Sequence, residues 1–70
     1  KESLVGKKME VIIEGVDEEN PNVFIGRTYR DAPEVDGVVR LHCRKAPPLH
    51  SFQQALITEA QDYDLEGKLL

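Results

Sequence analysis

Apolar and polar residues alternate along several short segments of the chain, with the period of two that is typical of half-buried β-strands. The segments are separated by turn signals such as Asn20-Pro21 and Asp36-Gly37. The alternation predicts strands within residues 7–15, 23–27, 38–43 and 63–70. We expect their buried faces to carry Met9, Val11, Ile13, Val39, Leu41 and Cys43. Gly26, inside the second segment, indicates a bulge or a close backbone approach.

The segment SFQQALITEAQDY (51–63) fits two structures. Its apolar residues fall at helical spacing, and Ser51 is a suitable N-cap, so local propensity favours a helix. The rest of the chain consists of short strands with turn signals, which is typical of a small barrel or sandwich and favours another strand here. The pattern alone leaves residues 51–60 undecided between strand and helix.

Composition limits the classes of protein to which the chain can belong. Seventy residues predict a single domain, residues 1–70, with a thin core. A net charge of −4 argues against generic binding of polyanions. One cysteine excludes an internal disulfide, and the apolar runs are too short for a membrane span, so we expect a cytoplasmic protein. The opening Lys-Glu-Ser, without an initiator Met, indicates a fragment of a larger protein, and we expect a monomer.

Charge is distributed unevenly along the chain. Residues 1–26 carry three basic and six acidic groups, and residues 46–70 carry one basic and four acidic groups. Residues 27–45 carry five basic and three acidic groups, a net charge of +2. The segment GRTYRDAPEVDGVV (26–39) lies within this basic third. Such a count is typical of a mixed-sign solvated face, but it is also compatible with a contact surface.

We predict a partner-binding surface in and beside this segment. Its arginines offer forked donors, its tyrosine offers a stacking plane, and its acids accept hydrogen bonds from a basic partner. Pro33 stiffens the loop, which reduces the entropy lost on binding. The alternative is that the same groups pair with one another and close the fold. The candidate residues are Arg27, Tyr29, Arg30, Asp31, Glu34, Asp36 and Arg40.

Catalytic and metal-binding motifs are absent from the sequence, which has no phosphate-binding glycine loop and no paired cysteines. His42 and Cys43 are adjacent in a predicted strand, so they point to opposite faces and cannot chelate one metal ion. We expect a core Cys43, and His42 and His50 on the surface. The acids at 17–19 lack the spacing of a calcium loop and indicate a solvated turn.

Three segments, LVGKKMEVIIEG, GRTYRDAPEVDGVV and ITEAQDYDLEGKL, together resemble the TRAM domain of radical-SAM methylthiotransferases. The ITEA segment with its following Leu and Gly is shared with the tRNA-modifying (MiaB-like) branch. The stretch YRDAPEVDG resembles more specifically the branch that methylthiolates an aspartate of a small-subunit ribosomal protein (RimO-like). The resemblance implies a five-stranded antiparallel, OB-like β-barrel, and it would make residues 52–60 a strand.

The resemblance also implies a function for the loop, which would help to dock the substrate of a catalytic domain lying upstream. That radical-SAM domain would hold an iron–sulfur cluster (4Fe-4S) and S-adenosylmethionine, whereas this domain would bind no cofactor or metal, contain no catalytic residue and be no enzyme alone. The partner would be a basic small-subunit ribosomal protein, which suits an acidic domain. Two alternatives are an RNA-binding module centred on Arg27, Arg30, Arg40 and Arg44, and a structural cap that contacts only the upstream domain.

Overall fold

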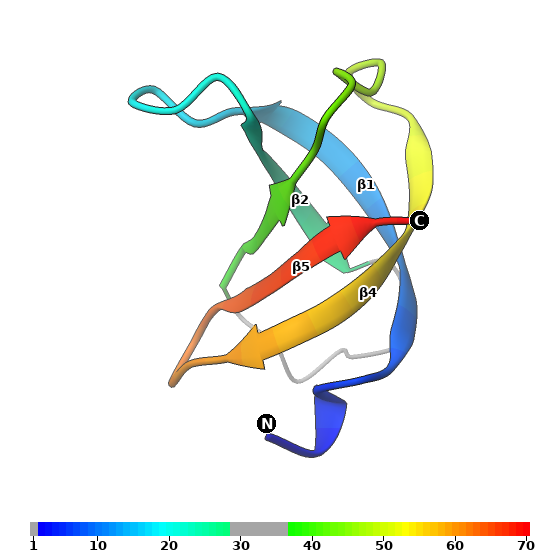
Figure 1. The fold of residues 1–70 in the computed structure, drawn as a ribbon, viewed down its shortest axis with the longest axis vertical. Helices are drawn as coiled ribbons and strands as arrows, with labels where there is room; N and C mark the ends of the chain where they lie inside the picture. Colours follow the sequence, from blue (N-terminus) through cyan, green and yellow to red (C-terminus); the bar gives the residue numbers. More distant parts are fainter. Residues whose placement is uncertain (1, 29–36) are drawn as a thin grey trace.

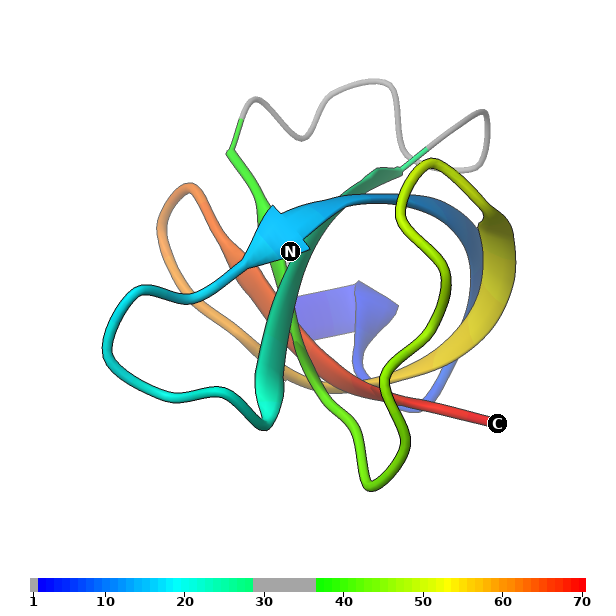
Figure 2. The ribbon, with the colours of Figure 1, turned by 90° about the horizontal axis from the view of Figure 1, so that it is seen from above.

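The structure, a computed structural model, describes residues 2–28 and 37–70. In these residues a 3₁₀ turn precedes five strands that close into a barrel in the order β1-β2-β3-β5-β4 (Figures 1 and 2). The elements are η1 (Glu2–Leu4), β1 (Lys8–Val16), β2 (Val23–Thr28), β3 (Val39–His42), β4 (Phe52–Ala60) and β5 (Leu65–Leu69). The predicted all-β barrel is confirmed.

One strand pair differs from the purely antiparallel barrel that the resemblance implies. β3 and β5 run parallel, with Val39 opposite Leu65 and His42 opposite Lys68, while the other four pairs are antiparallel. A parallel pair needs a long crossover between its strands. Here that crossover consists of the connector 43–51, the whole of β4, which pairs with β1, and the turn 61–64.

Residues 52–60 form a strand, so the helical interpretation of this segment is wrong. Ala55 and Ile57 point into the barrel, whereas Phe52 and Tyr63, which the helical spacing placed on the same face as Ala55, are 50% and 70% exposed. β4 pairs with β1 along one edge and with β5 along the other. Backbone groups on both edges of β4 therefore form hydrogen bonds within the sheet. Tertiary pairing thus overrides the helix propensity of its Gln, Ala and Leu residues.

The barrel interior contains the alternating residues that the sequence pattern selects. Every residue predicted for a buried face, from Met9 to Cys43, is buried in the structure. Register shifts between Ile13 and Gly15 in β1, and between Ile57 and Glu59 in β4, interrupt the two longest strands. Such irregularities increase local twist, which helps a nine-residue strand to curve around a small barrel. The core consists of Leu4, Met9, Val11, Ile13, Phe24, Val39, Leu41, Cys43, Ala55, Ile57 and Leu65.

Gly26 marks the close backbone approach that its position in a strand predicts. A Cβ atom built at this position would lie 2.8 Å from the carbonyl oxygen of Ile12 and 3.2 Å from Cδ1 of Leu41. A side chain would therefore collide with the backbone of β1. Glycine here allows β2 to lie tightly against β1.

The barrel has two ends with different contents. The loop end comprises η1, the turn 61–64 between β4 and β5, and Gly37-Val38 at the start of β3 (Figure 1). The connector end comprises the turn 17–22 between β1 and β2, the connector 43–51, and Leu70 after β5. In the described part of the chain, no helix combines the length and the apolar character that crossing a membrane would require.

Candidate partner-binding surface

The structure brings together only part of the predicted partner-binding set. Arg27 lies near the end of β2 and Arg40 lies in β3, and both side chains are on the outside of the barrel. The other predicted residues, Tyr29, Arg30, Asp31, Glu34 and Asp36, lie outside the described residues. The geometry of the surface is therefore built from the strands on either side of residues 29–36.

Arg27 is held by an acid of the neighbouring strand. Its Nε donates a hydrogen bond to Oε1 of Glu14 in β1 at 2.9 Å, and both side chains are about half exposed. The close packing of β2 on β1 at Gly26 brings the two residues together. An ion pair this exposed contributes little to stability, but it fixes the direction of the guanidinium group.

Arg40 is held more firmly, by an acid of the turn 17–22. Its Nη1 donates to Oδ1 of Asp17 at 3.0 Å, while the backbone N–H groups of Glu19 and Asn20 both donate to Oδ2 at 3.1 Å. The hydrogen bond from Arg40, followed by the one from Glu19, lowers the pKa of Asp17 below its ordinary value. Asp17, predicted only as part of a solvated turn, thus closes that turn and anchors Arg40 to it.

A third pair joins β3 and β5 and lies between His42 and Glu66. Nε2 of His42 lies 3.0 Å from Oε1 of Glu66, and Nε2 of Gln61 donates to the other carboxylate oxygen at 3.3 Å. The hydrogen bond with His42 lowers the pKa of Glu66. We call these three pairs the charged band; it consists of Glu14, Arg27, Asp17, Arg40, His42 and Glu66. Within it, Arg27 and Arg40 pair with Glu14 and Asp17, two acids outside the predicted set.

The start of β3 is fixed by the turn that precedes β5. The backbone N–H of Val38 donates to Oδ1 of Asp64 at 3.2 Å, and its carbonyl accepts from the N–H of Leu65 at 3.0 Å. A Cβ atom at Gly37 would overlap Oδ1 of Asp64 and the carbonyl oxygen of Tyr63. Only glycine fits between these groups. The sequence marks Asp36-Gly37 as a turn, but nothing in it identifies Asp64 as the partner.

The sulfur and imidazole groups do not form a reactive centre in this fold. Cys43 is buried, its thiol donates to the carbonyl of Leu41 at 3.5 Å, and burial raises its pKa. His42 and His50 are exposed, as predicted. Among residues 2–28 and 37–70, no three His, Cys, Asp or Glu side chains gather closely enough to hold a metal ion. A protonated, buried thiol is a poor nucleophile.

The chain is similar to known proteins over almost its entire length. Residues 5–70 match the family described as TRAM domain. The chain is 46% identical over 66 residues to the ribosomal protein uS12 methylthiotransferase RimO of Lachnoclostridium phytofermentans, and 49% identical over 67 residues to the protein of that name from Fervidobacterium nodosum. A protein of the same name from Vibrio vulnificus is 46% identical over 66 residues.

These alignments cover 94%, 96% and 94% of the chain, but only 15%, 14% and 13% of the respective relatives. The chain thus spans about one seventh of the length of these relatives. Their shared name is that of the ribosomal-protein branch that YRDAPEVDG resembles, which confirms that likeness. The family match from residue 5 to residue 70, on a closed five-stranded barrel, shows that this chain belongs to the TRAM domain family.

Proposed function

We propose that this domain recognises the substrate of a ribosomal-protein methylthiotransferase. The observation that carries the proposal is the 40–49% identity, over nearly the whole chain, to proteins named as methylthiotransferases of ribosomal protein uS12. We expect the catalytic part of the enzyme to lie in the remaining six sevenths of the relatives' length. The 70 residues contain a single cysteine, so the iron–sulfur cluster and S-adenosylmethionine implied by the resemblance would be held elsewhere. We expect no methylthiotransferase activity from the domain alone.

The charge of the domain supports a protein substrate. Its net charge of −4 would attract a basic ribosomal protein and would repel a tRNA backbone. Because Arg27 and Arg40 already form ion pairs with Glu14 and Asp17, they are poorly placed to grip phosphates as well. Under this proposal the cytoplasmic domain acts as a monomer next to its own catalytic domain.

The binding surface would combine the charged band with the segment that connects β2 to β3. In this proposal Asp31, Glu34 and Asp36 accept hydrogen bonds from the basic partner, and Tyr29 and Arg30 contact it beside them. Arg27 lies in β2 and Arg40 in β3, the strands before and after this segment, and their ion pairs hold the acids of the band in place. The arginines would then organise the surface, and the acids would supply the attraction.

The test is a side-by-side titration of the 70-residue chain with purified uS12 and with a tRNA anticodon stem–loop, at low and at physiological salt. We expect uS12 to bind, and the triple variant D31K/E34K/D36K to weaken this binding about tenfold or more. The variant E18K/E19K/E59K changes the net charge equally at exposed acids elsewhere and should weaken it much less.

Three outcomes would contradict the proposal. Equal losses in the two triple variants would show that only the net charge matters and would remove the role of the segment. Tighter binding of the stem–loop, with the steep salt dependence of phosphate contacts, would instead assign the domain to RNA recognition. Binding of neither ligand would favour a cap that contacts only the rest of the enzyme.

A further inference from the structure

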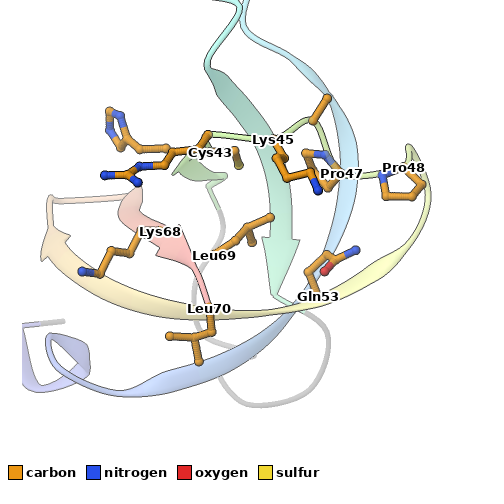
Figure 3. Close-up of a pocket in the computed structure, with 11 residues that line it drawn as sticks. Cys43, Lys45, Pro47, Pro48, Gln53, Lys68, Leu69 and Leu70 are labelled. Carbon is orange, nitrogen blue, oxygen red and sulfur yellow. The ribbon is translucent and has the colours of Figure 1, made fainter.

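A hollow of about 610 Å³ opens at the connector end of the barrel, beside the end of β3. One wall is the connector 43–48, and the other is the end of β5 with Leu70, while Gln53 of β4 lies at its base (Figure 3). An adjoining cavity of about 520 Å³ shares His42, Cys43, Arg44 and Lys68 with it. This volume lies in the range of sites that take small ligands or a few side chains of a partner.

Three cations border the hollow: Arg44, Lys45 and Lys68. All three are exposed, and none makes an ion pair with another described residue, in contrast to Arg27 and Arg40. The chain carries 13 acidic and nine basic residues, yet no Asp or Glu among the described residues lines either cavity. The hollow is therefore a locally positive site on an acidic domain.

Apart from His42 and Gln53, the rest of the lining is apolar, and hydrogen bonds hold the connector in its shape. Pro47 is buried and Leu69 is half buried, and Pro48 and Leu70 add exposed apolar surface beside the cations. Two hydrogen bonds hold the connector in place: the Ser51 hydroxyl donates to the carbonyl of Pro48 at 2.6 Å, and Nε2 of Gln53 donates to Ser51 Oγ at 2.9 Å. The backbone N–H of His50 also donates to the carbonyl of Ile13 at 2.6 Å. A connector held this way loses little entropy on binding.

We propose that this hollow docks an acidic segment of a protein partner, with carboxylates on Arg44, Lys45 and Lys68 and an aliphatic side chain against Pro47 and Leu69. The planar fork of Arg44 suits a carboxylate, and the proline and leucine surfaces suit an apolar side chain. This partner is distinct from the basic substrate of the proposed function. The site goes beyond that function and does not depend on it.

The lining favours a protein segment over single-stranded RNA. Binding of single strands depends on aromatic side chains on which bases stack, and in residues 2–28 and 37–70 no Phe, Tyr or Trp lines either cavity. A peptide with two carboxylates needs only the local charge match that the hollow offers.

The experiment is a titration of the ¹⁵N-labelled chain with a short capped peptide in which Glu and Leu alternate, followed by NMR. We expect shifts at Arg44, Lys45, Lys68 and Leu69, and we expect the matched Gln–Leu peptide to bind at least tenfold more weakly. The variant R44E/K45E should lose about tenfold or more in affinity for the Glu–Leu peptide. The variant K7E/K8E reverses two adjacent exposed lysines at the start of β1 and should leave the affinity nearly unchanged.

Each contrary outcome overturns the proposal. Equal binding of the two peptides would remove the carboxylates from recognition, and equal losses in the two variants would reduce the effect to net charge. If an oligouridylate of similar length binds this hollow more tightly than the peptide, the site belongs to RNA. If the chain self-associates, and R44E/K45E abolishes the association, the occupant is a second copy. The spectrum of each variant shows directly whether it is folded.

Discussion

The charged band and the basic hollow use residues of the same type in opposite ways. In the band, Arg27 and Arg40 each form an ion pair with an acid that belongs to the β1 strand or to the turn after it. Around the hollow, Arg44, Lys45 and Lys68 make no ion pair with another described residue. Arg40 and Arg44 are only four residues apart in the sequence.

The two regions meet at His42, the last residue of β3, which belongs to the band and also lines the hollow. Arg40 precedes His42 and has strands on both sides, with Ile25 opposite in β2 and Glu66 opposite in β5. Arg44 follows it, where the chain leaves the sheet and no cross-strand neighbour is available. Arg44 and Lys45 lie on the connector, and Lys68 lies in β5 opposite His42 and Leu56, so no acid stands across from any of the three hollow cations. The difference predicts that breaking the band's pairs costs more stability than removing the hollow's cations.

The largest expected effect comes from Gly26→Ala, which should damage the band and spare the hollow. The new Cβ atom would lie 2.8 Å from the backbone oxygen of Ile12, so β2 must move away from β1, and Arg27 with it. We expect a loss of about 1–3 kcal/mol in the free energy of unfolding, measured by urea denaturation. In NMR spectra, shifts should appear at Glu14 and Arg27 and be small at Lys45.

Gly15→Ala is the matched control for this substitution. Gly15 lies in β1, in the same strand pair, and a Cβ atom there would have no neighbour within 4 Å. Alanine restricts the unfolded chain more than glycine does, so this variant should be unchanged or more stable by about 0.4–1 kcal/mol. A Gly15→Ala variant as unstable as Gly26→Ala would show that the contact with Ile12 is not the cause.

Asp17→Ala should have the next largest effect, because it removes an ion pair and two turn hydrogen bonds together. The N–H groups of Glu19 and Asn20 lose their acceptor, and Arg40 loses its partner. We expect a clear fall in the urea midpoint, smaller than for Gly26→Ala, and a smaller fall for Arg40→Ala, which leaves the turn hydrogen bonds intact. If Arg40→Ala costs as much as Asp17→Ala, the ion pair rather than the turn carries the stability.

The fold could be predicted from the sequence largely because its core follows local alternation. Met9, Val11 and Ile13 reveal a strand without any knowledge of its neighbours. Residues 52–60 could not be assigned in this way, since their strand state depends on pairing with both β1 and β5, which are distant in the sequence. The parallel pairing of β3 with β5 depends on the closure of the barrel in the same way.

The functional surface was less accessible to prediction, because it depends on pairs that only the fold brings together. Residue type identifies Arg27 and Arg40 as candidates, but their partners Glu14 and Asp17 lie 13 and 23 residues away. The basic hollow was missed because Lys68 is far in sequence from Arg44 and meets it only through the pairing of β3 with β5. A surplus of basic residues in 27–45 was the only signal, and it did not separate the two regions.

The pH dependence of stability should also distinguish the band from the hollow. Hydrogen bonds from Arg40 and His42 lower the folded-state pKa values of Asp17 and Glu66, so the unfolded chain binds protons more readily. The stabilisation that these two carboxylates give to the folded state is complete above about pH 4, the pKa of such groups in an unfolded chain. It is lost as the pH falls further through their folded-state pKa values. The urea concentration at the unfolding midpoint should therefore decrease when the pH is lowered below about 4. The variant D17N/E66Q should flatten this fall, whereas Arg44→Ala should keep the wild-type profile.

The smallest effect is expected for removal of the hollow's cations. Arg44→Ala, Lys45→Ala and Lys68→Ala break no ion pair among the described residues, so each should change the free energy of unfolding by less than about 0.5 kcal/mol. Arg27→Ala, which loses an exposed pair, should cost about as little or slightly more. Urea denaturation of the four variants in parallel provides the measurement. A loss above about 1 kcal/mol at Arg44 or Lys68 would show that these cations hold the connector against β5, and the contrast in stability between the two regions would then fail.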